Sequence, residues 1–234
     1  MHASKQTKAA YDTSVDVLTQ LGEAIPEAVD AEDFESRAKN LQIRLSALSE
    51  QDLMNMKDCH DKTHYSLMKF YEHIELLAFL TKPSMFKWYA CRLVELSLEH
   101  GTCKYAALGM MRFAMLLTGK IFYNVDEAYG IGKMAMKLVE RYNASELLPS
   151  VYLAFYGHVA VHVEPIQSIA DMHKRGFEIG ISIGDIQTAL FNYVHYIQKA
   201  LISGSNLPAL KKDCDYLIRL STEQGMPFVK AYAR

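Results

Sequence analysis

Apolar residues recur every three or four positions along nearly the whole chain, the spacing that places them on one face of an α-helix. After Tyr65 they fall at Leu67, Phe70, Tyr71, Ile74, Leu77, Ala78 and Leu80. Pro83 then predicts the start of a new helix, because proline suits a first helical turn and disrupts a helix interior. The sequence has no sustained period-two alternation and no Asn-Gly or Asp-Gly hairpin turn, so we expect an all-α protein.

The chain contains an internal repeat. Gly101, Asn143, Gly184 and Gly225 each end a helical pattern, and they are 42, 41 and 41 residues apart. Glycine and asparagine adopt the left-handed conformation that often ends a helix. Aligned on these four, matching apolar positions recur fifteen, seven and five residues upstream: Phe86, Ala128, Ile169 and Leu210; Val94, Met136, Phe177 and Ile218; and Leu96, Leu138, Ile179 and Leu220. The template predicts a repeat with a period of about 41 residues.

Each period is predicted to hold two helices. The second helices are expected at 83–100, 125–142, 166–183 and 207–224, and the first at 102–118, 145–161 and 185–202, with a fourth from Met226. Upstream helices are expected at 5–21, 31–48 and 62–81, with a cap and short turn at Ser49–Asp52. Stacked antiparallel hairpins of this kind form an α-solenoid similar to tetratricopeptide arrays. We expect one domain over residues 1–234, irregular in 1–81 and regular in 82–234, within a larger protein.

Composition narrows the classes of function. The 234 residues are 50% hydrophobic and carry 25 basic and 27 acidic side chains, a formal net charge of −2, which does not favour nucleic acid. The cysteines at 59, 91, 103 and 214 are too far apart for a zinc knuckle, so we interpret them as free thiols. The first six residues lack the apolar core of a secretory signal, and no apolar run is long enough to span a membrane. These features predict a cytoplasmic protein.

Three short motifs resemble ligand sites. Gly130-Ile131-Gly132-Lys133 resembles part of a phosphate loop, but it lies inside a predicted helix and lacks the required flanking residues, so we interpret its glycines as sites of close helix packing. His158 and His162, with Glu164 nearby, are four apart on a predicted helix, and Cys59, His60 and His64 form a similar group. A zinc site needs three or four ligands, so we interpret these histidines as solvated or half-buried. We expect no metal and no cofactor, and the absence of a catalytic motif predicts a protein that is not an enzyme.

Aromatic side chains gather on two predicted first helices: Tyr152, Phe155 and Tyr156 with His158 on one, and Phe191, Tyr193 and Tyr196 with His195 on the next. Packing between helical layers is one interpretation, and a binding groove is the other, since aromatic residues are enriched at binding hot spots. The candidate partner-binding residues are Tyr152, Phe155, His158, His162, Tyr193 and Tyr196.

Several stretches carry a family resemblance: Leu96–Gly101, Tyr105–Gly109, Tyr129–Leu138, Gly176–Gly180 and Gly184-Asp185. From about Tyr11 onward the chain resembles the tetratricopeptide-like helical region of large signalling proteins that combine a protein-kinase-like domain, a predicted ATPase, a GAF domain and a histidine kinase. His162 departs from that family, which tends to have Trp three residues before the equivalent of Pro165. The resemblance implies a sensory or scaffolding role beside an ATPase.

We therefore expect a protein–protein interaction or signal-relay module whose partner is another protein or a neighbouring domain of the same polypeptide, with no nucleic acid or membrane partner. The sequence sets no oligomeric state. The alternative is a small-molecule sensor, in which the aromatic and histidine cluster of residues 152–162 and 191–196 encloses an apolar ligand in a cavity of several hundred Å3, on the order of ordinary ligand sites.

Overall fold

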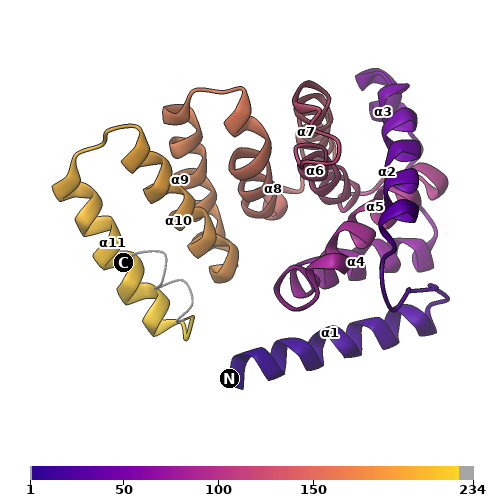
Figure 1. Ribbon diagram of the computed structural model, residues 1–234, viewed down its shortest axis with the longest axis horizontal. Helices are drawn as coiled ribbons and strands as arrows, with labels where there is room; N and C mark the ends of the chain where they lie inside the picture. Colours follow the sequence, from indigo (N-terminus) through magenta and orange to yellow (C-terminus); the bar gives the residue numbers. More distant parts are fainter. Residues whose placement is uncertain (1, 227–234) are drawn as a thin grey trace. The chain divides into compact units, whose positions relative to one another are not determined.

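The computed structural model describes residues 2–226, apart from the side chains of residues 2–6, 76 and 80 (Figure 1). Over this range the chain forms eleven α-helices and no β-strand, which confirms the all-α prediction. The helices are α1 (His2–Gln20), α2 (Ala31–Ser46), α3 (Glu50–Asn55), α4 (Lys62–Thr81), α5 (Pro83–His100), α6 (Ala106–Leu117), α7 (Val125–Arg141), α8 (Leu148–Ala154), α9 (Ile166–Ile183), α10 (Ile186–Ile202) and α11 (Leu207–Glu223). None of these helices is both long and apolar enough to cross a membrane.

The second helices of the predicted hairpins begin at the predicted residues and end within one residue of the predicted ends. All four predicted stop residues have positive φ angles: 100° at Gly101, 49° at Asn143, 81° at Gly184 and 67° at Gly225. The end of each helix is therefore encoded by a residue that tolerates this conformation. The fourth first helix, expected from Met226, lies outside the described residues.

Three elements differ from the prediction. The helix expected from residue 102 starts at Ala106, because Thr102 instead exchanges backbone hydrogen bonds with Lys57 and Cys59. Ser49 caps a short helix, α3, rather than only a turn, and its hydroxyl and the Asp52 carboxylate form a capping box. The helix expected over 145–161 is instead a series of short segments: a 3-10 turn, η1 (Ser145–Leu147), then α8, a π-helical turn, η2 (Phe155–Val159), and a 3-10 turn, η3 (Ala160–His162).

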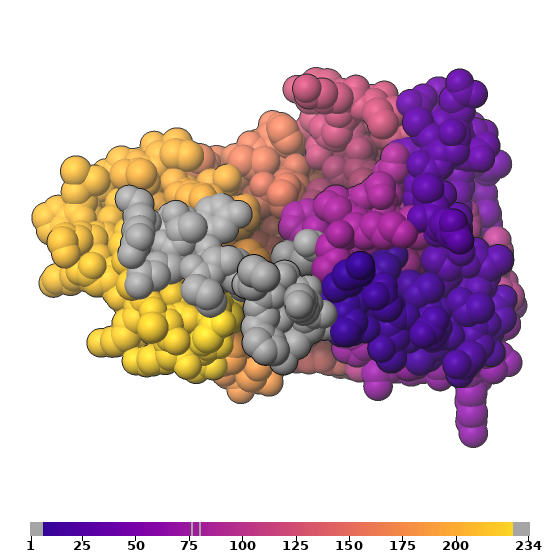
Figure 2. Space-filling model, turned by 60° about the horizontal axis from the view of Figure 1, so that its bottom comes forward, coloured from indigo at the N-terminus to yellow at the C-terminus, as the bar shows by residue number. Residues whose placement is uncertain are grey.

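The chain divides into two compact units, Met1–Tyr142 and Asn143–Arg234, each described by itself below. This boundary differs from the change of regularity expected at residue 82, and the single-domain organisation stays a prediction. In unit 1, α4 packs against α1 and α5, α5 against α2 and α6, and α7 against α3 and α6. Figure 2 shows one face of this unit in indigo to magenta.

The core of unit 1 is mixed aliphatic and aromatic. Tyr71 and Ile74 of α4 are buried against Met85 and Tyr89 of α5, and the Tyr89 hydroxyl shares a hydrogen bond of 2.9 Å with that of Tyr11 on α1. This bond satisfies both hydroxyl groups inside the core, where an unpaired polar group would be costly. The three cysteines of this unit, Cys59, Cys91 and Cys103, are buried free thiols.

Unit 2 is built around α9 and α10. Helix α9 packs against α8 and α10, and α10 packs against α8 and α11. Close approach of α9 and α10 depends on small residues: a Cβ at Gly176 would lie 2.7 Å from the Asn192 side chain, and one at Gly180 would lie 2.8 Å from Ala189. Gly176 and Gly180 are therefore sites of close packing between the two helices.

Candidate functional site

A groove of about 350 Å3 lies between α10 and α11 in unit 2. Ile197 and Leu210 are buried, whereas the side chains of Leu201 and Leu207 are 54% and 65% exposed. The complete lining is Ile197 and Leu201 from α10 with Leu207, Leu210, Lys211, Cys214, Asp215 and Ile218 from α11. The groove is thus a mostly aliphatic surface open to solvent, which is the character of a surface that binds another apolar group.

The charged lining residues of the groove, Lys211 and Asp215, carry opposite charges that cancel. Lys211 Nζ and Asp215 Oδ2 form an ion pair of 2.7 Å, one helical turn apart on α11. Partial burial raises the pKa of the Cys214 thiol, so the protonated form is favoured at neutral pH. These groups offer no activated nucleophile.

A cluster of aromatic rings connects α9, α10 and α11 beside the groove. The Tyr193 ring lies 4.4 Å from Phe177, 5.5 Å from Tyr196 and 5.7 Å from Tyr216, measured between ring centroids. The Tyr193 hydroxyl donates a hydrogen bond of 2.8 Å to the Asp213 carboxylate. Burial and this neighbouring carboxylate raise the pKa of Tyr193, which keeps its hydroxyl protonated. The cluster packs the three helices together.

A second cluster in unit 2 contains buried polar groups. His173 is fully buried, and its Nδ1 lies 3.0 Å from Asn192 Oδ1, while Asn192 Nδ2 donates to the carbonyl oxygens of Pro149 and Thr188. The His195 ring stacks on His173 with centroids 5.0 Å apart. Burial lowers the pKa of His173 to about 4 and that of His195 to about 3, so both rings are neutral at physiological pH.

The residues predicted from sequence as partner contacts occupy two environments. Tyr152, Phe155 and Tyr193 are buried inside unit 2, Tyr196 is half-buried, and His158 and His162 are exposed. Rings pack directly on one another here: Tyr156 lies 5.4 Å from Tyr152 and 5.1 Å from Phe155. As partner contacts, the six residues stay predictions.

The histidines of the candidate ligand motifs lie in different local structures. The regular α-helical spacing expected between His158 and His162 is absent, because the chain passes from a π-helical to a 3-10 turn between them. His64 stacks on His100, with centroids 3.5 Å apart. Within the part of the chain that the structure describes, no three His, Cys, Asp or Glu side chains are placed to hold one metal ion.

The glycines at 130 and 132 lie in the interior of α7, as expected, but they differ in environment. Gly132 is buried, whereas Gly130 is exposed and a Cβ there would meet nothing within 4 Å. Close helix packing was therefore the wrong interpretation for Gly130.

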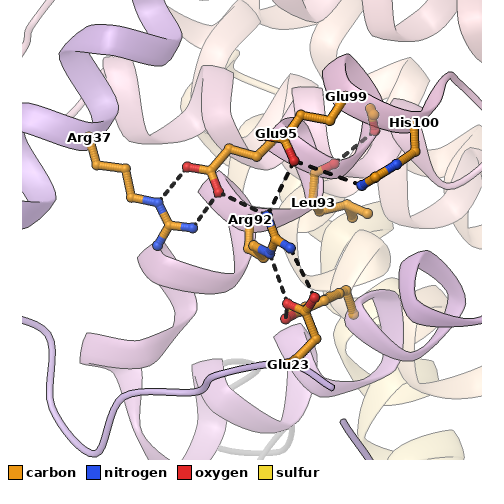
Figure 3. A network of polar contacts seen from close by, with 9 residues as sticks. Glu23, Arg37, Arg92, Leu93, Glu95, Glu99 and His100 are labelled. Atoms are coloured by element: carbon orange, nitrogen blue, oxygen red, sulfur yellow. Dashed lines mark hydrogen bonds and ion pairs between the residues drawn. The ribbon is translucent and has the colours of Figure 1, made fainter. Parts of the chain in front are cut away.

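Unit 1 also contains a polar network that no motif in the sequence indicates (Figure 3). Arg92 of α5 donates two hydrogen bonds, of 2.8 and 2.9 Å, to the carboxylate of Glu23, which follows α1. Arg37 of α2 forms a second bidentate pair, with Glu95 of α5, and its guanidinium lies 4.8 Å from the centroid of the Trp88 ring. The two pairs are connected, because Arg92 Nη1 is 3.5 Å from Glu95 Oε2.

The network has a structural role in unit 1. Burial acts to raise the pKa of Glu23, but hydrogen bonds from Arg92 and Tyr71 outweigh it and hold that pKa below its usual range. The carboxylate is therefore ionised and paired on two sides. Because Glu23 follows α1 and Arg37 belongs to α2, the network fastens the segment between these helices onto α5. Its residues are 58 and 69 positions apart in sequence, so no local motif signals it.

Comparison with known proteins adds no relative: no family model, curated protein or solved structure matches this chain. The groove between α10 and α11 is therefore a candidate site on its geometry alone.

Proposed function

We propose that the chain is a helical-repeat module that works by contact with other protein surfaces and has no catalysis of its own. The observation that carries the proposal is the set of four stop residues, Gly101, Asn143, Gly184 and Gly225, which recur at a nearly constant spacing and all have positive φ. Each ends a helix whose first residue recurs at the same spacing.

Burial at equivalent positions supports a stack of hairpins. The column fifteen residues before the stops, Phe86, Ala128, Ile169 and Leu210, is buried in all four copies. The column five residues before the stops is buried at Leu96 and Leu138 and half-buried at Ile179 and Leu220. A hairpin that cannot cover its own apolar face needs a neighbour to do so, which is the physical basis of solenoids.

The open groove supports a role in contact. Exposed leucines beside a buried aliphatic floor resemble the centre of a protein interface more than an ordinary surface. The family resemblance of the sequence supports a regulatory position within a larger signalling ATPase or kinase, where the partner is another protein or a neighbouring domain.

The alternative function is a sensor for a small apolar molecule. The groove favours this alternative in one respect, since its volume of about 350 Å3 falls within the range of known ligand sites. The cluster around Tyr152 and Tyr193, where the sequence placed the ligand, is occupied by packed rings, so the groove is the better location for a ligand.

One experiment separates the two functions. The tagged chain is crosslinked and recovered from its source cells, and each recovered protein is then purified and titrated against the chain by calorimetry. In parallel, native mass spectrometry measures whether the recovered chain carries a small molecule. We expect direct binding of at least one purified protein. A stoichiometric small molecule, with no protein that binds after purification, would replace our proposal with the sensor.

A further inference from the structure

Two extended segments of unit 1 pair with each other, one just before α4 and one just after α5. Asp58 and Thr102 form an isolated parallel β-bridge between them. The backbone N–H of Cys59 donates to the Thr102 carbonyl oxygen at 2.8 Å, and that of Thr102 donates to the Lys57 carbonyl oxygen at 2.9 Å. A Cβ atom at Gly101 would lie 2.6 Å from the Lys57 carbonyl oxygen. Glycine at residue 101 therefore allows the two segments to approach this closely.

The bridge places Cys59 and Cys103 side by side. The Tyr142 hydroxyl oxygen lies 2.7 Å from Asp58 Oδ1 and 2.8 Å from Thr102 Oγ1, so both bridging side chains point to the same side. Successive side chains of an extended chain point to opposite sides. The next residue of each segment is a cysteine, and both cysteines belong to the core of unit 1 on the other side.

The spacing of the two cysteines suits a disulfide. Paired extended segments lie about 4.8 Å apart, and the Cα atoms of a disulfide lie about 4.4–6.8 Å apart. Each thiol now has a different partner: Cys103 Sγ lies 3.2 Å from Met68 Sδ, and Cys59 Sγ lies 3.8 Å from the Asp61 carbonyl oxygen. Both are weak hydrogen bonds of sulfur, so rotation of the two side chains can replace them with one S–S bond.

Burial makes the two thiols slow to react. It raises the pKa of Cys59 above its usual value and that of Cys103 to about 11, so both thiols are protonated at neutral pH. The thiolate is the reactive form, so the pair stays reduced unless an oxidant is present in quantity. Cys59 is 8% exposed and Cys103 is 4% exposed, so the reaction begins at Cys59.

We propose that Cys59 and Cys103 are a redox-sensitive pair, which a small-molecule disulfide oxidises to one intramolecular disulfide that stabilises unit 1. The Cys59 sulfur attacks one sulfur of the oxidant, whose S–S bond breaks and releases a thiolate. The Cys103 sulfur then attacks Cys59 in this mixed disulfide and releases the second thiolate. The two thiol protons pass to the released thiolates, so the oxidant gains the two electrons and two protons that the cysteines lose.

The disulfide closes a loop that contains both α4 and α5. Because residues 59 and 103 can then no longer separate, the bond restricts the unfolded chain and favours the folded one. Transient disulfides of this kind serve as redox sensors in reducing compartments. The inference goes beyond the proposed function and is independent of it, since it needs neither a partner nor the groove of unit 2.

The test maps the disulfides of the whole native chain after treatment with oxidised glutathione. Remaining thiols are alkylated in denaturant, and the tryptic peptides are identified by mass spectrometry. Each cysteine falls in a different tryptic peptide: 58–62, 88–92, 93–104 and 213–219. We expect peptides 58–62 and 93–104 to be joined and Cys91 to remain a thiol. Cys214, the least buried cysteine, should carry glutathione and so report that the oxidant has acted.

Thermal unfolding of unit 1, followed through Trp88, measures the effect of the bond. Oxidation should raise the midpoint by roughly 5–10 °C, and a reductant should reverse the shift. Cys59→Ala and Cys103→Ala should each abolish the joined peptides and the shift. The matched control is Cys91→Ala, at a fully buried thiol on α5, which should keep both.

Peptide mapping of the wild-type chain requires no variant to fold. Separate peptides 58–62 and 93–104 after Cys214 is fully modified, or a bond from either peptide to Cys91, would overturn the pair. A midpoint that oxidation leaves unchanged or lowers would overturn the stabilising effect. Either result would leave the proposed contact with other proteins untouched, because that proposal is tested by binding.

Discussion

Gly176 of α9 faces the Asn192 side chain of α10 so closely that a Cβ atom at residue 176 would lie 2.7 Å from Asn192 Oδ1. Asn192 cannot easily move away, because its amide nitrogen donates to two backbone carbonyl groups and its oxygen lies 3.0 Å from His173 Nδ1. The contact between α9 and α10 therefore fixes both the helix spacing and a buried hydrogen-bond network.

We expect Gly176→Ala to destabilise unit 2 by about 1–2 kcal/mol, because overpacking outweighs the gain of about 1 kcal/mol in helix propensity. Gly130→Ala in α7 is the matched control, since a Cβ there meets nothing within 4 Å. The control should be neutral or slightly stabilising. Urea unfolding, monitored in each unit by hydrogen exchange, measures the free energy of unfolding of both variants. Equal changes in that free energy would contradict tight packing at Gly176.

Acid should destabilise unit 2 selectively. The folded pKa values of His173 and His195, about 4 and about 3, lie below the value of 6.5 for an exposed histidine, so the unfolded chain binds protons first as the pH falls. The largest cause is burial, and the neighbouring charges are Lys199 and His158, which act in the same direction. Stability should fall by about 1.4 kcal/mol per ring between pH 7.5 and 5.5. His195→Gln should remove one ring's share, as measured by hydrogen exchange.

The exposed His162 provides the control for acid sensitivity. His162→Gln should follow the wild-type pH profile. If unit 2 kept its full stability at pH 5.5, the two rings would have to be accessible to protons in the folded state, contrary to their burial.

The buried Glu75 should give the stability of unit 1 the opposite dependence on pH. Its carboxyl is fully buried, and burial raises its pKa to about 8 despite Arg112, whose Nε lies 3.6 Å away. Because the folded pKa exceeds the unfolded one, the stabilising effect of the proton is present below pH 4.5 and is lost as the pH rises towards 8. Glu75→Gln should stabilise unit 1 by an amount that grows by about 1.4 kcal/mol per pH unit in that window.

Thermal unfolding of Glu75→Gln at pH 5, 7 and 8, followed through the single Trp88 of unit 1, measures this effect. Glu140→Gln, on the exposed side of α7, is the control and should show no such trend. A uniform loss of stability at every pH would show instead that Glu75 is ionised and paired with Arg112.

Arg92→Gln should destabilise unit 1 by about 3 kcal/mol, because it leaves the buried Glu23 carboxylate without its bidentate partner. Lys137→Gln, which breaks an exposed pair with Glu50, should cost less than about 0.5 kcal/mol. The double variant Glu23→Gln/Arg92→Gln should recover part of the loss, since no charge is then left unpaired. Chemical denaturation of the three variants provides the comparison, and a double variant weaker than Arg92→Gln would contradict this account.

Helix ends could be predicted from sequence where they are encoded locally. Pro83 and Gly101 set the ends of α5 by their own backbone preferences, and Gly184 does the same for α9. The π-helical turn after α8 carries no such local signal and arises within the packing of unit 2. The sequence therefore predicted one continuous helix there.

The sequence predicted the apolar character of the candidate site but not its exposure. The repeat template marked Leu210 and Ile218 as apolar positions, but whether such residues are covered depends on the next helix, which periodicity does not specify. The polar network of Glu23, Arg37, Arg92 and Glu95 could not be predicted from the sequence. Its members are brought together only by the packing of α2 and the segment after α1 onto α5.

The wide turn at Phe155–Val159 has the geometry of a one-residue insertion placed inside a helix rather than in a loop. Each α-helical residue advances the direction of its side chain by about 100°, so one extra residue in an α-helix rotates everything after it by roughly a quarter of a turn. Gly157 lies in this turn, and a Cβ atom there would lie 3.5 Å from the His195 ring and 3.7 Å from the His173 ring. A version of the chain one residue shorter here would restore an ordinary helical phase and change the direction in which Ala160 and the rest of η3 face.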